Sequence, residues 1–411
     1  MHSLKNTKLA IIGLGYVGLP LAIEFSKKFD TVGFDINFDR IKQLNKGIDS
    51  TKEFSKNYIK SSKYLKITNQ IDKLSDRTIF IITVPTPIYK NKKPDFRNLI
   101  DATKRIAKIF KKKSIIIYES TVYPGLTEEI CIPIIEKKTK LIANKDFFYG
   151  YSPERINPGD KKHQLKNIKK IVSGSNGFAE KIIKRLYETI IQAGVYVAPS
   201  VKIAEAAKVI ENIQRDINVA FANELFKIFE KLNLNTFEIL KAANTKWNFL
   251  NFQPGLVGGH CIGVDPYYLL HKCKKINLKP KIITVGRKIN DEMGLHYSNL
   301  INKKIKSQFK NKKIKILILG YTFKENCSDI RNTKVHDIYE YFNKKKHDVH
   351  IYDPWINFDL KGVKLVKKLN KNYYDCVIIT VKHDFFIKLG KKRILSYAKR
   401  NNIFYDIKKI F

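Results

Sequence analysis

The sequence predicts an α/β protein in which two parallel-sheet domains flank a central domain built on a long helix. Three observations predict it: short apolar runs alternate with helical patterns early in the chain, the apolar period changes near residue 201, and new apolar runs begin near residue 314. Alternating strands and helices are typical of a parallel sheet with helices on both faces. We expect domains at residues 1–198, 199–301 and 302–411.

Five short apolar runs predict the strands of the first sheet. They are Leu9–Gly13, Thr31–Asp35, Thr78–Val84, Ser114–Glu119 and Lys170–Ser173. A helical stretch, Leu19–Phe29, follows the first run almost at once. The beginning of the chain therefore has the strand, turn and helix order of a nucleotide-binding unit.

The glycine-rich turn Gly13–Gly18 (GLGYVG) lies between that first strand and its helix. Gly13 permits the turn, Gly15 lets a pyrophosphate approach the helix N-terminus, and Gly18 lets helix and strand pack closely. Asp35, at the end of the next strand, would accept a hydrogen bond from a ribose 2'-hydroxyl and repel a 2'-phosphate. This context favours a site for NAD over NADP, against the alternative that the glycines serve only a tight turn.

Polar loops follow three further strands. The loops Val84–Pro87 and Glu119–Gly125 carry hydroxyls that could touch nicotinamide, ribose or substrate, and capping of the following helix is an equal alternative. The loop Tyr151–Gly159 concentrates proline, glycine and charge. Its Glu154 is a candidate general base, or an ordinary solvated residue of an exposed loop.

One unusually long helix is predicted from Val201 to about Leu232, where apolar residues recur every three or four positions without glycine or proline. Such a helix usually joins domains or builds a dimer interface. Lys208 and Asn212 stand four residues apart and share one face, next to the apolar stripe. A lysine there indicates a functional ammonium, or a side chain that snorkels to solvent.

The segment Gly258–Asp265 (GGHCIGVD) places one thiol, Cys261, after two glycines and one carboxylate four residues later. Glycines let a backbone approach a ligand, and a cysteine beside a charged group can be kept as the thiolate that attacks carbonyl carbon. The segment predicts a buried nucleophile with a polar helper. A small buried cysteine in a tight turn is the alternative.

A second α/β domain is predicted from strands at Ile314–Gly320, Asp348–Asp353 and Asp375–Val381. The second of these ends in Tyr-Asp-Pro, which contains Asp353, and the third leads into Lys-His-Asp, which contains His383. Open α/β sheets bind ligands at the carboxyl ends of their strands. We therefore expect these polar residues to face a crevice.

The composition is that of a globular chain of 411 residues with an extreme positive charge. Lysine and arginine number 78 against 38 acidic residues, a formal net charge of +40. Such a charge can indicate a nucleic acid, a membrane surface or an anionic small substrate. Because lysine is spread over every segment and no arginine-rich tract occurs, we interpret it as solvated surface and expect no nucleic-acid partner.

Cysteine and histidine usage limits the kinds of site that the chain can form. Five cysteines without a CxxC pair suit a reducing compartment, and the nine histidines lack ligand spacing, so we expect no metal. The first apolar stretch is too short for a signal peptide or a membrane span. We therefore expect cytoplasmic localisation and no membrane insertion.

A set of motifs occurs in order along nearly the whole chain. They are Gly13–Gly18, VPTP at Val84–Pro87, Ser120-Thr121, Ser152-Pro153-Glu154, Ala204–Lys208 with Asn212, Gly258–Cys261 with Asp265, and Gly320–Lys324 with Arg331. With this ordered set the chain resembles the UDP-glucose/GDP-mannose dehydrogenase family. Within it, Lys246–Leu250 (KWNFL) and Gly255–Leu269 are similar to bacterial UDP-N-acetylhexosamine (UDP-GlcNAc or UDP-GalNAc) 6-dehydrogenases of surface-polysaccharide synthesis, the Vi-antigen type that serves capsule or O-antigen.

The resemblance implies NAD-dependent four-electron oxidation of the C6 hydroxyl of a UDP-N-acetylhexosamine, first of all UDP-N-acetylglucosamine, with two NAD per turnover. Cys261 would capture the aldehyde as a thiohemiacetal and then carry a thioester that water releases. The other catalytic residues implied are Lys208 and Asn212 as donors to the oxyanion, Asp265 to position the water or Lys208, Thr121 as a hydroxyl, and Glu154 in hydrolysis.

The resemblance also implies binding residues and a homodimer built on the long helix. The cofactor would be bound by Gly13, Gly15, Tyr16, Val17, Gly18, Asp35, Arg40, Thr86, Thr121 and Arg331. The UDP-sugar would be bound by Glu154, Arg155, Lys208, Asn212, Leu250, Asn251, Phe252, Gln253, Pro254, Gly258 and Lys324.

Two positions depart from the family pattern. Members acting on UDP-glucose commonly carry a second glutamate four residues after that of the Ser-Pro-Glu motif, where this chain has Pro158. This weakens UDP-glucose as substrate, and we interpret the loop Arg155–Gly159 (RINPG) as room for an N-acetyl group. The family's lysine just before the aspartate is Val264 here, which puts one cofactor contact in doubt.

Other functions stay open from the sequence. Within the class they are UDP-glucose, UDP-N-acetylmannosamine and GDP-mannose 6-dehydrogenases. A nucleic-acid-binding Rossmann protein would explain the charge but leaves Cys261, Lys208 and Asp265 without a purpose. A non-catalytic protein that binds a nucleotide sugar is the remaining alternative.

Overall fold

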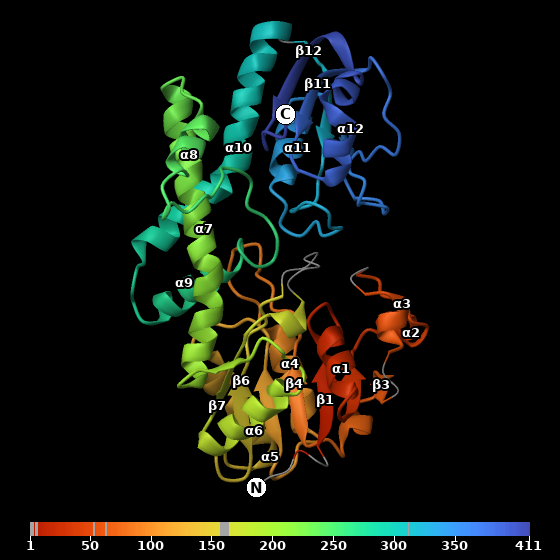
Figure 1. Ribbon diagram of the computed structural model, residues 1–411, viewed down its shortest axis with the longest axis vertical. Coiled ribbons are helices and arrows are strands. Elements are labelled where there is room, and N and C mark those ends of the chain that lie inside the picture. Colours follow the sequence, from red (N-terminus) through yellow and green to blue (C-terminus); the bar gives the residue numbers. More distant parts are fainter. Residues whose placement is uncertain (1–3, 5–6, 52–53, 62–63, 157–163, 311) are drawn as a thin grey trace. The chain divides into compact units, whose positions relative to one another are not determined.

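The computed structural model describes residues 4, 7–51, 54–61, 64–156, 164–310 and 312–411. The chain divides into two compact units, the first made of residues 1–211 and 267–278 and the second of residues 212–266 and 279–411. Two helices run from one unit into the other, α7 (Val201–Lys231) and α9 (Asp265–Lys275). The mixed α/β class predicted from the sequence is confirmed (Figure 1).

The first unit is a sheet covered by helices. Its strands are β1 (Lys8–Ile12), β2 (Asp30–Phe34), β3 (Leu65–Thr68), β4 (Ile79–Ile82), β5 (Ile115–Tyr118), β6 (Phe148–Tyr151), β7 (Lys170–Gly174) and β8 (Val195–Val197). Its helices are α1 (Gly18–Ser26), α2 (Phe38–Asn45), α3 (Lys56–Ile59), α4 (Arg97–Ala107), α5 (Ile132–Thr139) and α6 (Gly177–Glu188), with short helical turns η2 (Ile71–Leu74), η3 (Thr127–Cys131) and η4 (Leu165–Asn167).

The strands of this sheet lie in the order β3-β2-β1-β4-β5-β6-β7-β8. All neighbours are parallel except β6 and β7, so the parallel sheet that the sequence predicts is present with one antiparallel pair. The five predicted strands are present, whereas β3, β6 and β8 were not predicted. β3 and β8 are short and only partly buried, so they lack the continuous apolar run that predicts a buried strand.

The core of the first unit joins the central strands to two helices. Ile11, Ile81 and Ile117 come from β1, β4 and β5 and are fully buried together with Phe25 of α1 and Tyr187 of α6. The two rings meet edge to face, with centroids 5.5 Å apart. Each such side chain contributes about 1.5–3 kcal/mol by leaving water, so this cluster fixes the strand ends on which the site depends.

The second unit contains the remainder of α7, the helices α8 (Thr236–Ala243) and α10 (Lys281–Phe309), and a smaller sheet. The predicted long helix is confirmed almost to the residue, because nothing in its sequence interrupts it. Between α7 and α10, Asn290 donates to the carboxylate of Asp216 over 2.8 Å, and Arg287 pairs with the same carboxylate. Burial raises the pKa of Asp216 to about 6, although Arg287 acts in the opposite direction.

The smaller sheet has the order β10-β9-β11-β12, all parallel. Its strands are β9 (Lys315–Leu319), β10 (Asp348–Tyr352), β11 (Tyr374–Ile379) and β12 (Ala398–Asp406), and its helices are α11 (Val335–Lys344) and α12 (Asp384–Leu395). Ile316 and Ile318 of β9 pack with α10 and α11, whereas Leu317 and Leu319 pack with Phe386 of α12. β12 was not predicted, because charged and amide residues fill its first half.

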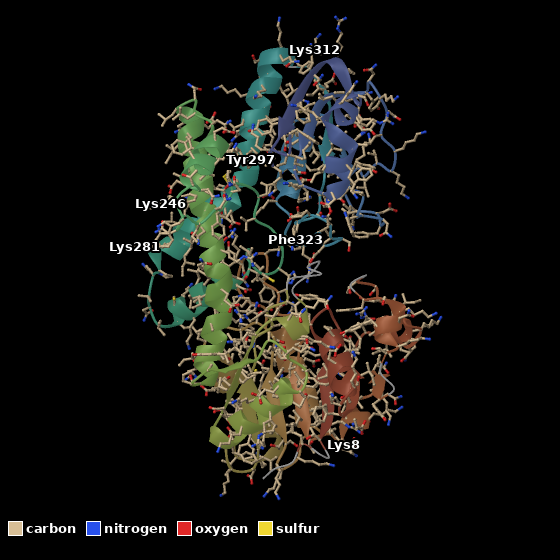
Figure 2. All side chains as sticks on the ribbon, in the orientation of Figure 1. Lys8, Lys246, Lys281, Tyr297, Lys312 and Phe323 are labelled. Carbon is tan, nitrogen blue, oxygen red and sulfur yellow. The ribbon has the colours of Figure 1, made fainter. Side chains whose placement is uncertain are left out.

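The lysines do not gather in one stripe. Figure 2 shows side chains with terminal nitrogens projecting from all parts of the described chain, with Lys8, Lys246, Lys281 and Lys312 labelled in four different segments. None of the helices in the described part of the chain combines the length and apolar character that crossing a bilayer requires.

The predicted domain boundary at residue 302 falls inside α10, and the boundaries stay a prediction.

Candidate functional site

The glycine turn after β1 has the geometry that a bound dinucleotide needs. Gly13 adopts a φ of +93°, and its N–H donates to the carbonyl of Phe34 over 2.8 Å. A Cβ on Gly18 would lie 1.9 Å from the Gly13 carbonyl oxygen, so the helix can approach the strand only through glycine. A Cβ on Gly15 would meet nothing within 4 Å, which leaves this side of the turn open. The residues present therefore fit a pyrophosphate at the helix N-terminus.

Asp35 and Arg40 shape this turn from two sides. The Asp35 carboxylate accepts the N–H groups of Leu14 and Asn37 over 2.8 and 2.9 Å and is half-buried. Arg40, a predicted cofactor contact, is buried and donates to the Leu14 carbonyl over 2.9 Å while pairing with Asp49 at 2.6 Å. Arg40 thus holds the turn in place. The predicted contacts Tyr16 and Val17 lie half-buried in the same turn.

The loops after β4 and β5 are joined by side-chain to backbone hydrogen bonds. Thr86 donates to the carbonyl of Thr121 over 2.8 Å, and Ser120 donates to the carbonyl of Val84 over 2.7 Å. Thr86 and Ser120 therefore use their hydroxyl hydrogens to hold the two loops together. Thr121, whose hydroxyl is predicted to be catalytic, is half-buried in the second of these two loops.

Glu154 is a buried carboxylate and not an exposed loop residue. It accepts the N–H groups of Arg155 and Ile156 over 2.6 Å, and it pairs with Lys170 of β7 at 3.1 Å. Lys170 also pairs with Glu119 at 2.8 Å. Burial raises the pKa of Glu119 to about 7. The charge of Lys170 lowers this pKa, and the charge of Glu154 raises it. The two carboxylates in turn raise the pKa of Lys170 although its burial lowers it.

Arg155 has its own partners beside this network. It pairs with Glu211 at 2.9 Å and donates to the carbonyl of Lys169 over 2.8 Å. Pro158, on which the interpretation of N-acetyl accommodation depends, lies outside the described residues.

The predicted Lys208 is buried on α7, next to a carboxylate that sequence reasoning missed. Glu205, fully buried, accepts the N–H groups of Gly125 over 2.5 Å and Thr127 over 3.0 Å. Burial raises the pKa of Glu205 to about 7, although these hydrogen bonds lower it. Glu205 therefore fastens α7 to the loop that follows Thr121. The available signal was a glutamate less than one turn before Lys208, on the helix face that also carries Val201 and Val209.

In the second unit, the other half of the predicted catalytic set comes together. Asn212 of α7 donates to the carboxylate of Asp265 over 2.5 Å, and both side chains are buried. The N–H of Asp265 donates to the carbonyl of Cys261 over 2.8 Å, so Cys261 lies in the turn that opens α9. Cys261 itself is half-buried, which corrects the prediction of a fully buried thiol. Partial exposure is what a nucleophile that must reach a substrate requires.

The loop before Cys261 is fixed by α7. Asn223, fully buried, donates to the carbonyl of Gly255 over 3.1 Å and accepts the N–H of the same glycine over 2.7 Å. This residue was missed, because an asparagine on a helix gives no signal of its partner in sequence. Of the predicted substrate contacts in this loop, Leu250, Asn251 and Gln253 are exposed, Phe252 is half-buried and Pro254 is buried.

The glycines before Cys261 are packed against the loop after β9. A Cβ on Gly259 would lie 2.6 Å from the ring of Phe323, and the N–H of Gly259 donates to the carbonyl of Arg331 over 3.0 Å. Arg331 pairs with Asp329, and a guanidinium nitrogen lies 2.9 Å from Nδ1 of His260. Burial would raise the pKa of Asp329, but hydrogen bonds from His260 and Arg331 lower it. Arg331, predicted near the cofactor, is thus held beside the cysteine loop.

A small hollow lies in the second unit, lined by the predicted substrate residues Gly258 and Lys324 and by two more lysines, Lys334 and Lys408. Burial lowers the pKa of Lys408, partly offset by Glu325. Ammonium groups around one hollow suit an anionic ligand such as a diphosphate. Lys408 was missed because it follows β12, the strand that was not predicted.

Among the described residues, no group of three or more histidine, cysteine or acidic side chains is arranged to hold a metal ion.

Comparison with protein families gives three matches in series. Residues 7–191 match the NAD binding domain of the UDP-glucose/GDP-mannose dehydrogenase family, residues 202–292 its central domain, and residues 317–411 its UDP binding domain.

Individual proteins are similar over almost their full length. The chain is 48% identical over 413 residues to a UDP-N-acetyl-D-glucosamine 6-dehydrogenase of Salmonella typhi, covering 99% of this chain and 97% of that protein. It is 48% identical over 410 residues to a protein of the same name from Pseudomonas aeruginosa, covering 98% and 97%. Among solved structures, a UDP-D-ManNAc dehydrogenase from Pyrococcus horikoshii has a TM-score of 0.89 at 29% identity, covering 98% and 96%.

Proposed function

Because the chain belongs to the UDP-glucose/GDP-mannose dehydrogenase family, a family of NAD-dependent nucleotide-sugar dehydrogenases, we propose that it oxidises the C6 hydroxyl of UDP-N-acetylglucosamine to the carboxylate. The substrate is supported by 48% identity to two proteins that carry this activity in their names. The chemistry is supported above all by one contact, the buried hydrogen bond from Asn212 to Asp265 at the helical turn that contains Cys261.

NAD supplies the acceptor for the hydride in each of the two oxidations. The turn at Gly13–Gly18 binds its pyrophosphate, and Asp35 binds its adenosine ribose.

Cys261 carries the sugar between the two oxidations. Its thiolate adds to the aldehyde carbon of the first product, and the oxygen takes up a proton to give a thiohemiacetal. The thiohemiacetal becomes a thioester when its carbon loses the second hydride to NAD and its hydroxyl loses a proton. Water then attacks the thioester carbon, the carbon–sulfur bond breaks, and the carboxylate, the Cys261 thiolate and two protons are released. The half-buried state of Cys261 suits this role, since the thiol must meet the substrate while bulk water is largely kept away.

Lys208 and Asn212 stabilise the oxyanion that forms at C6 in these steps. They stand four residues apart on α7 and are both buried, so they present an ammonium and an amide on the same helix face. Asp265 accepts a hydrogen bond from Asn212 and thereby fixes the orientation of its amide. Glu154, which pairs with Lys170 and accepts hydrogen bonds from two backbone N–H groups, assists hydrolysis.

The hollow with Lys324, Lys334 and Lys408 binds the diphosphate of UDP. We further propose a cytoplasmic homodimer with three domains, bounded near residues 198 and 301. The dimer is supported by an exposed apolar stripe on α7 formed by Ile203, Ile210, Phe221 and Ile228, spaced by seven or eleven residues on one helix face. Light scattering after gel filtration tests it, and a monomer of wild-type protein would refute it.

The stoichiometry of NADH tests the proposed function. With UDP-N-acetylglucosamine as limiting substrate, the wild-type protein should form two NADH and one uronic acid per sugar, and UDP-glucose, UDP-N-acetylmannosamine and GDP-mannose should react more slowly. C261S should lose net acid formation by a factor of about 10³ or more, because the alcohol cannot form the thioester. A matched control is C273S, a cysteine outside the proposed site. An unchanged rate in C261S would exclude Cys261 as nucleophile.

A further inference from the structure

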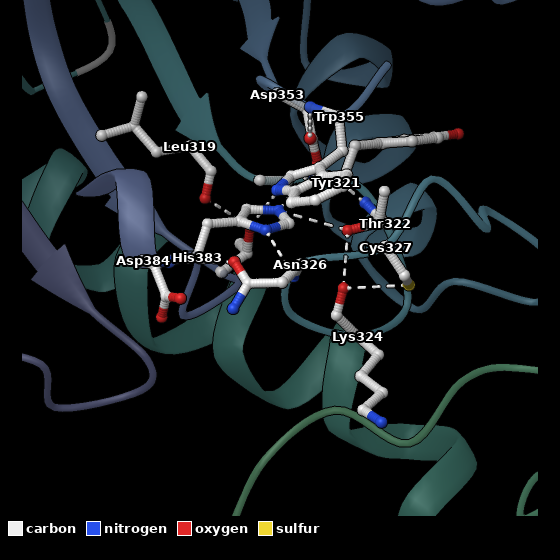
Figure 3. Close-up of polar contacts among 12 residues, drawn as sticks. Leu319, Tyr321, Thr322, Lys324, Asn326, Cys327, Asp353, Trp355, His383 and Asp384 are labelled. Carbon is white, nitrogen blue, oxygen red and sulfur yellow. Dashed lines mark hydrogen bonds and ion pairs between the residues drawn. The ribbon is translucent and has the colours of Figure 1, made fainter. Parts of the chain in front are cut away.

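A polar network at the carboxyl end of the smaller sheet has no part in the steps above. The loops after β9, β10 and β11 meet at His383, which is fully buried (Figure 3). Asp353, also buried, follows β10, and residues 321–327 form the loop after β9. A buried histidine that joins three loops at a ligand-binding edge can determine the shape of that edge.

The direction of each hydrogen bond in this network follows from one backbone donor. The N–H of Asn326 donates to Nδ1 of His383 over 2.9 Å, so Nδ1 carries no hydrogen and Nε2 carries it. Nε2 lies 3.2 Å from both the Asp353 carboxylate and the hydroxyl oxygen of Thr322 and donates to them. The Thr322 hydroxyl donates its own hydrogen to the carbonyl of Lys324 over 2.9 Å.

His383 therefore holds the β9 loop on both sides of Lys324. It contacts Thr322, two residues before, and Asn326, two residues after. The Lys324 carbonyl faces the network and also accepts from Sγ of Cys327 over 3.4 Å. The side chain of Lys324 extends away from the network (Figure 3) and lines the hollow together with Lys408.

We propose that His383 is a positioning residue for nucleotide binding, which fixes the loop that presents the Lys324 ammonium to the diphosphate of the UDP-sugar. The inference rests on the proposed function of the hollow and adds a residue that does not touch the ligand. His383 fixes the backbone at both flanks of Lys324, so that little conformational freedom is lost when the diphosphate binds.

A second buried histidine in the same sheet provides a matched control. His350 of β10 lies 3.1 Å from the Asp348 carboxylate and 3.1 Å from the Tyr374 hydroxyl. It resembles His383 in burial and in having an aspartate partner, but neither it nor its partners line the hollow. A purely structural role would make the two histidines equivalent in their effect on ligand binding.

The experiment measures the affinity for UDP by titration calorimetry, together with KM for the nucleotide sugar, KM for NAD, and kcat. His383→Leu should weaken UDP binding about tenfold and raise the KM for the nucleotide sugar by the same factor, because the buried N–H of Asn326 and the carboxylate of Asp353 lose their partner. The kcat and the KM for NAD should stay within about twofold of wild type. His383→Asn, whose side-chain oxygen can still accept from Asn326, should recover most of the affinity. His350→Leu should lower the unfolding midpoint and leave UDP affinity unchanged.

A double-mutant cycle with Lys324→Met decides whether His383 acts through Lys324. If it does, the double variant binds UDP no more weakly than Lys324→Met alone. Additive losses, or equal losses in His383→Leu and His350→Leu, would overturn the proposal. Because UDP affinity does not depend on turnover, a wild-type protein that binds UDP but forms no NADH would refute the proposed function and leave this test intact. A wild-type protein that does not bind UDP would refute the positioning role as well.

Discussion

The turns that follow β1 and β9, the first strands of the two sheets, have the same construction. Gly13 and Gly320 adopt φ values of +93° and +94°, and their N–H groups donate to the last residues of β2 and β10. Thr83 and Thr380, at the end of the neighbouring strand, each donate a hydroxyl hydrogen to the carbonyl of that glycine. In both turns an aspartate after the second strand accepts the N–H of the residue after the glycine.

The two aspartates differ in how far their oxygens are used. Asp35 is half-buried and receives two backbone N–H groups. Asp353 is buried and receives the N–H groups of Tyr321, Thr322 and Trp355 as well as His383. Burial would raise the pKa of Asp353, but His383 and the amides lower it. One carboxylate is thus accessible to a ribose, whereas the other is committed to holding its own loop.

The glycines explain which turn is open. Two and five residues after Gly13 stand Gly15 and Gly18, whereas the same offsets from Gly320 give Thr322 and Glu325. The first turn leaves space at Gly15 for a pyrophosphate, and the second fills the corresponding place with a hydroxyl that supports Lys324. The comparison indicates that one turn geometry serves either a dinucleotide or a lysine-bearing loop, depending on the side chains beside it.

The largest expected effect comes from Gly18→Ala. Its methyl group would lie 1.9 Å from the Gly13 carbonyl oxygen and 2.4 Å from Oγ1 of Thr83, so the turn must distort. We expect a loss of about 3 kcal/mol in the free energy of unfolding, measured by urea denaturation, and an NAD affinity at least about 100-fold lower. Gly177→Ala is the control, since a Cβ there meets nothing within 4 Å. Normal NAD binding by Gly18→Ala would contradict the close helix–strand contact.

Replacing Asp35 and Asp353 by asparagine, one at a time, tests whether the first serves NAD binding and the second serves UDP binding. Asp35→Asn should raise the NAD KM about 10- to 100-fold and reduce the preference for NAD over NADP, because a charged acceptor for the ribose is lost. Asp353→Asn should leave the KM for NAD within about twofold of wild type and weaken the binding of UDP. Steady-state kinetics with NAD, NADP and the nucleotide sugar separate the two outcomes. If Asp353→Asn impaired NAD as strongly as Asp35→Asn, the two turns would not have separate ligands.

A smaller effect is expected from Gly15→Ala. No protein atom lies within 4 Å of the added methyl group, and Gly15 does not adopt a positive φ, so the unfolding free energy should change by less than about 0.5 kcal/mol. The NAD KM should nevertheless rise about tenfold, because the methyl group occupies the approach of the pyrophosphate. Thr322→Gly, at the corresponding offset in the second turn, should leave the NAD KM unchanged. An unaltered NAD KM in Gly15→Ala would place the pyrophosphate elsewhere.

Sequence patterns predicted the parts of the molecule that depend on local order. The strands of both sheets with continuous apolar runs, α7, and the turn at Gly13 were predicted because periodicity and glycine spacing determine them directly. The partners of buried polar groups were not predicted. Asn223, Glu205 and His383 act on residues distant in sequence, so no spacing indicates their contacts. A solvated Glu154 stays an alternative in the sequence because its buried partner, Lys170, lies 16 residues further along the chain in β7.

The smallest expected effect is a change of stability with pH that comes from Glu205. Glu205 and Asp353 are both buried carboxylates that accept hydrogen bonds from backbone N–H groups. The pKa of Glu205 is raised to about 7 by burial, whereas that of Asp353 is lowered by its more numerous donors. A raised acid pKa means that folded protein holds a proton that unfolded protein releases, so stability declines as pH rises toward and through the folded pKa. Between pH 6 and 8 the contribution of Glu205 should fall by about 1 kcal/mol. Urea unfolding of wild type and E205Q at both pH values measures it, and equal pH slopes in the two proteins would show that Glu205 titrates normally.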